Sequence, residues 1–198
     1  MFKKKYAIPV SADAYINLYS ACNIGCPFCK FHQNVKEIVP IRIQLEKYYN
    51  QTVLICYSVD PYPIYYQKEL VPYVLKTLHK QNCKVVFLTR RVLPLYQDLA
   101  LFQAQDYVGV SISENNPFNS NLADIKKVFS LAKEKGVSTW ISLEPVESFS
   151  FVEHIINYFN GLVDFIRIGK NDVYLNQNWI ELKEKIDALN LDYVFVKE

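Results

Sequence analysis

Three of the five cysteines in this sequence fall within eight residues, in the segment Cys22-Asn23-Ile24-Gly25-Cys26-Pro27-Phe28-Cys29. The spacing is C-x3-C-x2-C. Three thiolates at this spacing can bind three irons of a 4Fe–4S cubane and leave the fourth iron open to a ligand that is not protein, whereas ordinary ferredoxin clusters use four cysteines. The segment therefore predicts a 4Fe–4S cluster on Cys22, Cys26 and Cys29, with Phe28 placed to shield it.

A structural zinc site is the alternative interpretation of the same segment. His32 follows Cys29 by two residues, so the three cysteines and His32 can also form a Cys3His tetrahedron. Zinc loops, however, usually pair C-x2-C knuckles at a distance, which favours the cluster. Five cysteines in 198 residues are too few for a disulfide scaffold.

The elements that must position these cysteines alternate along the whole chain. Apolar runs rich in β-branched and aromatic residues predict strands buried on both faces, at Ala14–Tyr19, Val53–Tyr57, Lys84–Thr89, Tyr107–Ser111, Val137–Leu143, Val163–Ile168 and Tyr193–Val196. Amphipathic segments between them predict helices at Ile43–Asn50, Tyr66–Gln81, Leu93–Gln103, Asn121–Lys135, Phe149–Phe159 and Trp179–Leu189. Asn121 has the character of a helix start and Gly136 that of a helix stop.

This alternation predicts an α/β protein with parallel strands and right-handed crossovers. A complete eight-fold barrel needs about 250 residues, so about six βα units in 198 residues predict a partial (β/α)6 TIM-type barrel. We expect residues 1–198 to form a single domain, although a flat doubly wound sheet has the same periodicity. No apolar stretch is long enough to span a membrane and no signal segment follows Met1, so we expect a cytoplasmic protein without a membrane partner.

Polar residues follow each predicted strand, where parallel α/β folds place their working groups. The cysteines follow the first strand. The later strand ends carry, in order, Ser58 and Asp60, Thr89 and Arg90, Ser111 and Ser113, Glu144, and finally Lys170, Asn171 and Asp172. We expect all of these residues to surround the opening of the barrel at the carboxyl ends of its strands.

A C-x3-C-x2-C loop after the first strand of a six-unit partial barrel resembles the radical S-adenosylmethionine (SAM) superfamily, over nearly the whole chain. The resemblance implies that SAM binds the open iron and is cleaved by one electron to a 5′-deoxyadenosyl radical. It also implies an external electron donor such as flavodoxin or ferredoxin. The Gly-Gly-Glu segment that the superfamily carries after its second strand is absent and is replaced by residues 58–62.

The residues at the other strand ends resemble the branch that contains spore photoproduct lyase. By that resemblance, Ser58 and Asp60 hold the SAM amino group and Arg90 faces the SAM carboxylate. Ser111 or Ser113 bonds the ribose, and Phe28 presses on the adenine. Loop polarity or helix capping remains the alternative for each polar residue taken alone.

Two further residues are candidates for roles in the reaction, Cys56 by resemblance to this branch and Glu144 by its place after the fifth strand. A cysteine at the place of Cys56 returns a hydrogen atom to the product radical in the lyase, although a free cysteine is more often a buried small hydrophobe. Glu144 is our candidate for the substrate contact, because a carboxylate can accept from two adjacent N–H groups of a planar base.

The net charge of +2 is not the basic excess of a duplex-binding protein, so we expect a small-molecule substrate and not nucleic acid. Among the short members of the branch the chain is most similar to queuine lyases, which release a 7-deazaguanine-type base. A radical SAM enzyme that repairs or modifies nucleic acid and a non-catalytic zinc module remain the alternatives.

Overall fold

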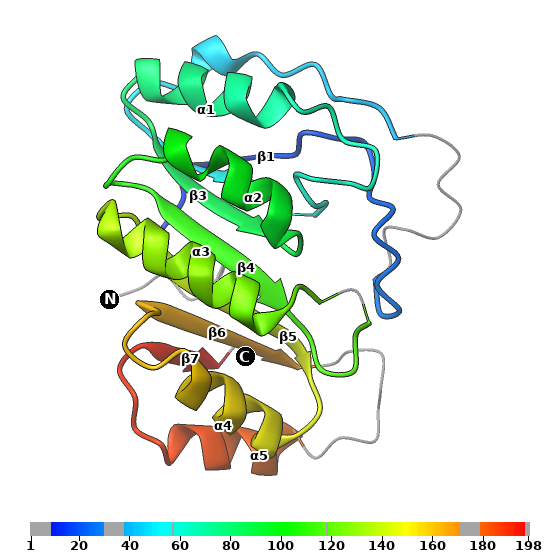
Figure 1. Cartoon of the computed structure of the whole chain (residues 1–198), viewed down its shortest axis with the longest axis vertical. Helices are drawn as coiled ribbons and strands as arrows, with labels where there is room; N and C mark the ends of the chain where they lie inside the picture. Colours follow the sequence, from blue (N-terminus) through cyan, green and yellow to red (C-terminus); the bar gives the residue numbers. More distant parts are fainter. Residues whose placement is uncertain (1–8, 30–37, 57, 118, 171–178, 197–198) are drawn as a thin grey trace.

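The sequence builds one curved sheet of seven parallel strands, in the order β1-β2-β3-β4-β5-β6-β7 (Figure 1). The structure is a computed structural model and describes residues 9–29, 38–56, 58–117, 119–170 and 179–196. The strands are β1 (Ala14–Ile16), β2 (Thr52–Ile55), β3 (Lys84–Thr89), β4 (Tyr107–Ile112), β5 (Ser138–Val146), β6 (Phe165–Lys170) and β7 (Val194–Val196). Because neighbours in sequence are neighbours in the sheet, all strands end at one edge.

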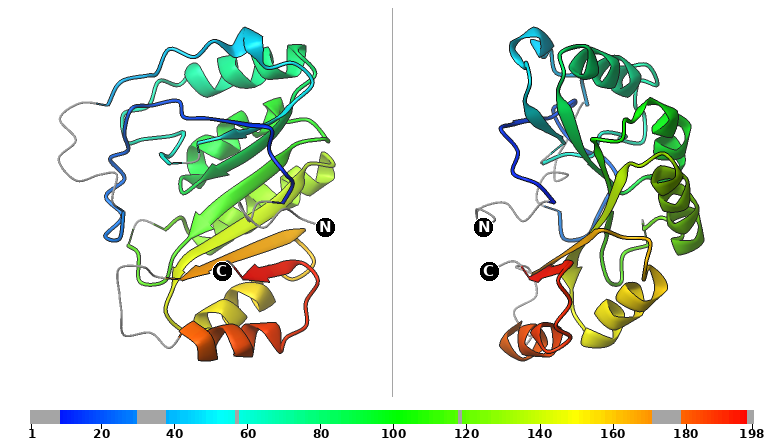
Figure 2. Two further views of the ribbon diagram at one scale, coloured as in Figure 1. Left: turned by 180° about the vertical axis from the view of Figure 1, so that it is seen from behind. Right: turned by 90° about the vertical axis from the view of Figure 1, so that its left-hand side faces the viewer.

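Helices cover the convex face of this sheet (Figure 2). They are α1 (Leu70–Lys80), α2 (Val92–Asp98), α3 (Leu122–Glu134), α4 (Phe149–Tyr158) and α5 (Trp179–Asp187), with short 3-10 helices at Leu45–Lys47 and Leu99–Leu101. The side chain of Asn121 accepts from the N–H of Ala123 at 2.8 Å and begins α3. Gly136, with φ of +73°, follows its end. The predicted partial TIM-type barrel is confirmed, because the sheet is parallel, curved and open between β1 and β7.

The helix expected at Ile43–Asn50 is wrong. Only Leu45–Lys47 is helical, as a single 3-10 turn. The chain just before it pairs with the segment that follows β1, with the N–H of Ile41 bonded to the carbonyl of Leu18 at 2.9 Å.

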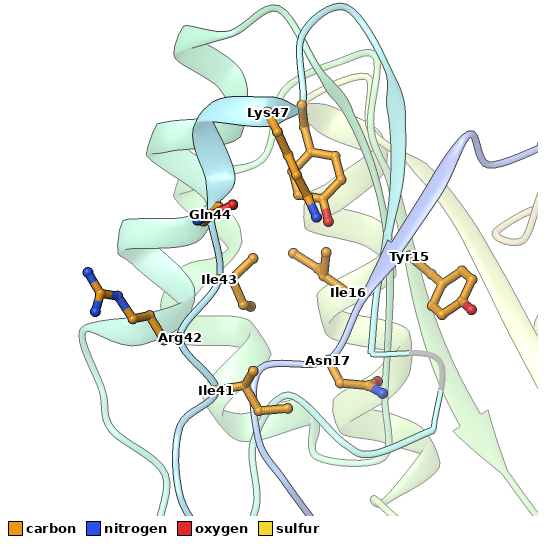
Figure 3. A pocket seen from close by; sticks show the side chains of 9 residues that line it. Tyr15, Ile16, Asn17, Ile41, Arg42, Ile43, Gln44 and Lys47 are labelled. Atoms are coloured by element: carbon orange, nitrogen blue, oxygen red, sulfur yellow. The ribbon is translucent and has the colours of Figure 1, made fainter.

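A hollow of about 650 Å³ lies between β1 and this segment (Figure 3). It is lined by Tyr15, Ile16, Asn17, Ile41, Arg42, Ile43, Gln44, Lys47 and Tyr48. A full helix in the first βα unit would pack over β1 on this side. The hollow contains none of the cysteines and none of the residues that follow β2 to β6, so it is not our candidate site.

The face of the sheet away from the helices has an aromatic floor. Trp140 and Phe165 are buried there with Leu54 and Val86, in a cluster separate from the core under the helices. The indole of Trp140 lies across β4 and donates to the carbonyl of Phe87 on β3 at 3.1 Å. This placement requires Gly109, because a Cβ at that position would lie 2.2 Å from Nε1 of Trp140.

We therefore expect Gly109→Ala to destabilise the protein by about 2–4 kcal/mol, since the methyl group displaces the indole and breaks its hydrogen bond. Urea unfolding measures the change. Trp140→Leu removes the indole that the methyl group would meet. The loss of unfolding free energy in the double variant Gly109→Ala, Trp140→Leu should therefore be smaller than the sum of the losses in the two single variants. Additive costs, or an alanine variant as stable as the wild type, would contradict this arrangement.

Candidate functional site

One cavity of about 190 Å³ is lined by the loop that carries the three cysteines and by the ends of β2, β3 and β4. The cavity is lined by Cys22, Ile24, Cys26, Phe28, Cys29, Cys56, Ser58, Val59, Asp60, Leu88, Thr89, Arg90 and Ser111. Nine of these thirteen are residues that the sequence singled out for the cluster, for SAM or for hydrogen return. The shared carboxyl edge of the parallel strands explains why they meet.

The cysteines have the environment of thiols held inside the protein. Cys22 and Cys26 are buried, and Cys29 is partly buried. Burial raises the pKa of the Cys22 thiol, and the N–H groups of Ile24 and Asp60 oppose this by donating to its sulfur. Burial likewise raises the pKa of Cys26, and the positive charge of Arg90 opposes it. Burial outweighs these groups, so both thiols are held in the neutral form, and a metal would have to displace their protons.

Asp60 braces the ends of β2 and β3. Its Oδ1 accepts from the N–H of Tyr62 at 2.9 Å and from the hydroxyl of Thr89 at 2.8 Å. Its Oδ2 accepts from the N–H of Arg90 at 2.7 Å. Burial raises the pKa of this carboxyl and the three donors oppose the shift. Since a carboxylate has about four acceptor positions, these bonds leave room for a further donor from the cavity.

Arg90 is fixed with its charge at the cavity. Its guanidinium donates to the hydroxyl of Ser113 at 2.9 Å and to the carbonyl of Glu144 at 3.1 Å. Its Cζ lies 5.0 Å from the centre of the Phe28 ring, a cation–π contact. Within the part of the chain that the structure describes, no carboxylate forms an ion pair with it. The side chain is therefore a positioned cation that an anionic ligand can neutralise.

Ser111 and Ser113 differ in their access to the cavity. Ser111 lines the cavity. Ser113 is fully buried and its hydroxyl accepts from Arg90 and from the side-chain amide of Asn116, the latter at 3.0 Å. Of the two serines proposed for the ribose, Ser111 is the one with access to a ligand, and Ser113 instead orients Arg90.

Cys56 lies at the end of β2 in an unusual conformation. It is buried, lines the cavity, and has φ of +63°, in the left-handed region. Its N–H donates to the carbonyl of Ile16 at 2.6 Å, which continues the pairing of β1 with β2. Burial raises the pKa of its thiol well above the usual value, so it remains a neutral S–H, the state that a hydrogen-atom donor needs.

Glu144 lies outside the cavity, on the inner face of β5. It forms an ion pair with Arg167 of β6, with 2.7 Å between Oε2 and Nη2. Sequence reasoning missed Arg167; the signal was a lone charge within the apolar run Phe165-Ile166-Arg167-Ile168. Thr89, which the sequence analysis named only as a strand end, donates a hydrogen bond to Asp60. Asn171, Asp172 and His32 lie outside the described residues.

The described residues hold no group of three or more His, Cys, Asp or Glu side chains gathered closely enough for a metal ion. A single zinc ion needs all its ligand atoms about 2.0–2.3 Å from one point. A cubane instead takes each thiolate at a different corner. Three thiols spread around one cavity fit the second arrangement in number, chemistry and burial.

Among the described residues, none of the helices has the length and apolar character needed to cross a membrane.

Comparison with known proteins finds similarity in structure alone. No protein-family model matches the sequence, and no curated protein matches it. The structure is similar to Streptococcus suis SuiB bound to S-adenosylmethionine, with a TM-score of 0.67 and 12% identity over 92% of this chain and 49% of SuiB. It is also similar to a spore photoproduct lyase variant with a dinucleoside spore photoproduct, with a TM-score of 0.59 and 10% identity over 91% of this chain and 75% of the lyase. The chain thus spans about half the length of SuiB, and it has the fold of these partial TIM-type barrels.

Proposed function

We propose that this protein is a radical SAM enzyme with a 4Fe–4S cluster on Cys22, Cys26 and Cys29. The observation that carries the proposal is the shared cavity: the cysteine loop lines it together with Asp60 and Arg90 at the ends of β2 and β3. When bound, the cluster would supply the electron that cleaves SAM to methionine and a 5′-deoxyadenosyl radical. The similar fold of SuiB, whose structure has S-adenosylmethionine bound, supports SAM as the ligand.

The chain offers SAM a group for each of its polar parts. The Arg90 cation suits the SAM carboxylate, and Ser58 and the remaining acceptor position of Asp60 suit its ammonium group. The Ser111 hydroxyl suits the ribose, and Phe28 offers its ring to the adenine. Arg90 and Asp60 are held by protein hydrogen bonds before any ligand binds, so little ordering is lost on binding.

Asp60→Ala tests this assignment. We expect SAM affinity to fall by about 1.5–3 kcal/mol, because a charge-assisted hydrogen bond in a partly desolvated site is lost. Iron content should remain normal. Thr89→Val is the matched control, because it removes one donor to Asp60 and leaves the carboxylate. Unchanged SAM affinity in Asp60→Ala, measured by equilibrium binding, would place the ammonium group elsewhere.

For the reaction, we propose cleavage of a small planar substrate, with queuine as the first candidate and a 7-deazaguanine-type base as the product. Glu144 lies on the same inner face of β5 as the buried Trp140, and its carboxylate can accept from the N–H groups of such a base. Cys56 is proposed to return a hydrogen atom to the product radical, and an electron from the external donor with a proton from solvent then restores its thiol. The similarity of fold to a spore photoproduct lyase supports a reaction of the lyase class.

One anaerobic experiment tests the chemistry as a whole. The protein is reconstituted with iron and sulfide, mixed with SAM and either dithionite or reduced flavodoxin, and screened for 5′-deoxyadenosine with candidate substrates. We expect 5′-deoxyadenosine to form and queuine to accelerate its release. A protein with bound iron that never yields 5′-deoxyadenosine would overturn the proposal.

A further inference from the structure

The Glu144–Arg167 ion pair is built into the inner face of the sheet. Glu144 alternates with Ser142 and Trp140 along β5, and Arg167 lies in register beside Ser142 on β6. Gly169 makes room for the carboxylate, because a Cβ there would lie 2.5 Å from Cδ of Glu144. The pair therefore occupies a place that the local backbone leaves open for it.

Fold stability does not account for this pair. The side chains of Arg167 and Glu144 are 14% and 29% exposed, so both charges have lost much of their water. Nε of Arg167 is buried and has no hydrogen-bond partner among the described residues, which is unfavourable for folding. Apolar side chains often serve stability equally well at such a position. Recognition of a ligand by the two side chains would explain why an ion pair lies at this position.

The chemistry of the pair specifies one kind of ligand edge. Arginine presents N–H donors only, in a planar fork, and an ionised glutamate presents acceptors only. Held side by side, they complement an edge on which a carbonyl oxygen lies next to an N–H group. The two charges cancel, so the pair favours a neutral ligand over a phosphate or carboxylate.

The ion pair adjoins a row of polar residues on the inner face of the sheet. Ser111, Ser142 and Arg167 form one row across β4, β5 and β6. Trp140 and Phe165 lie in the row below, with ring centres 6.3 Å apart. Both rings are buried and support the polar row from below, so a planar ligand would meet the ion pair with its polar edge.

We propose that Arg167 and Glu144 together bind the lactam edge of a neutral planar heterocycle, with Arg167 donating to its carbonyl and Glu144 accepting from its ring N–H. This inference rests on the proposed function and assigns the recognition of its guanine-type base to these two side chains. It adds Arg167 as a specificity-determining residue. Adenine-type bases, which lack the carbonyl and the adjacent N–H, are discriminated against.

The experiment measures selectivity on the reconstituted, SAM-loaded enzyme. Equilibrium dialysis under anaerobic conditions gives the affinities for 7-deazaguanine and 7-deazaadenine. We expect the wild type to prefer 7-deazaguanine at least about 10-fold, since unmatched polar groups are left when the edge is wrong. Arg167→Lys keeps the cation and loses the fork, so this preference should fall by about 10-fold or more. Arg42→Lys, the same change in the outer hollow, should leave it unchanged.

The ratio of affinities separates recognition from a purely structural role. Loss of packing weakens binding of both bases equally and leaves the ratio unchanged, and that result would overturn the inference, as would a wild type without preference. Arg167→Gln, which keeps an amide donor without the charge, is measured in parallel in case the lysine variant does not fold. Release of 5′-deoxyadenosine is assayed on the same preparations without any base, so failure of the proposed function is recognised independently.

Discussion

Changing Cys22, Cys26 or Cys29 to alanine is expected to abolish iron binding and all SAM cleavage. The wild type purified without oxygen should be brown, with about four irons per chain, because three thiolates and one open iron define the cubane. Each thiolate holds one iron, and neither Cys56 nor Cys83 lies on the loop to replace it. Iron analysis and the visible absorption spectrum measure the result.

Two controls make this prediction specific. Cys83→Ala removes a thiol that is buried away from the cavity and donates to the carbonyl of Tyr48 at 3.4 Å, so iron content should stay normal. His32→Ala should also keep the colour. A colourless protein with one zinc per chain, lost on His32→Ala, would instead establish the Cys3His zinc site.

The fold was largely predictable from the sequence because buried parallel strands have a strong pattern. Apolar runs such as Lys84–Thr89 coincide with the observed strand β3, since both faces of that strand are covered and the run is continuous. The first βα unit was the exception. Within its predicted helix at Ile43–Asn50 only Leu45–Lys47 is helical, and the residues just before it pair instead with the segment after β1.

The sequence predicted which residues of the site lie together, because their places at the strand ends determine this. Cys22, Asp60 and Arg90 meet around one cavity because parallel strands end at one edge, which follows from the order of elements alone. The partners of each side chain could not be predicted in this way. That Ser113 is turned away from the cavity to accept from Arg90, and that Glu144 pairs with Arg167, depends on side-chain directions set by the packed sheet.

Glu144→Gln is expected to abolish queuine turnover, with a loss of about 100-fold or more, while SAM still binds. The change keeps the size of the side chain and replaces one acceptor oxygen with a donor that opposes the N–H groups of the base. Discrimination of this kind is large because unmatched buried groups lose water without gaining a partner. The change also removes the charge that faces Arg167. SAM binding should persist, because Glu144 does not line the cavity and the hydrogen bond that it accepts from Arg90 goes to its backbone carbonyl, which the change keeps.

The measurement compares two products in the same anaerobic reaction. In Glu144→Gln, 5′-deoxyadenosine should still form slowly from SAM without cleavage of queuine, which uncouples the two steps. Glu153→Gln, the same change on the exposed surface of α4, should behave as the wild type. If Glu144→Gln loses SAM binding as well, the residue serves SAM and not the base. A wild type with its full iron content that cleaves SAM but leaves queuine intact would refute the substrate assignment, and the radical SAM proposal would stand without it.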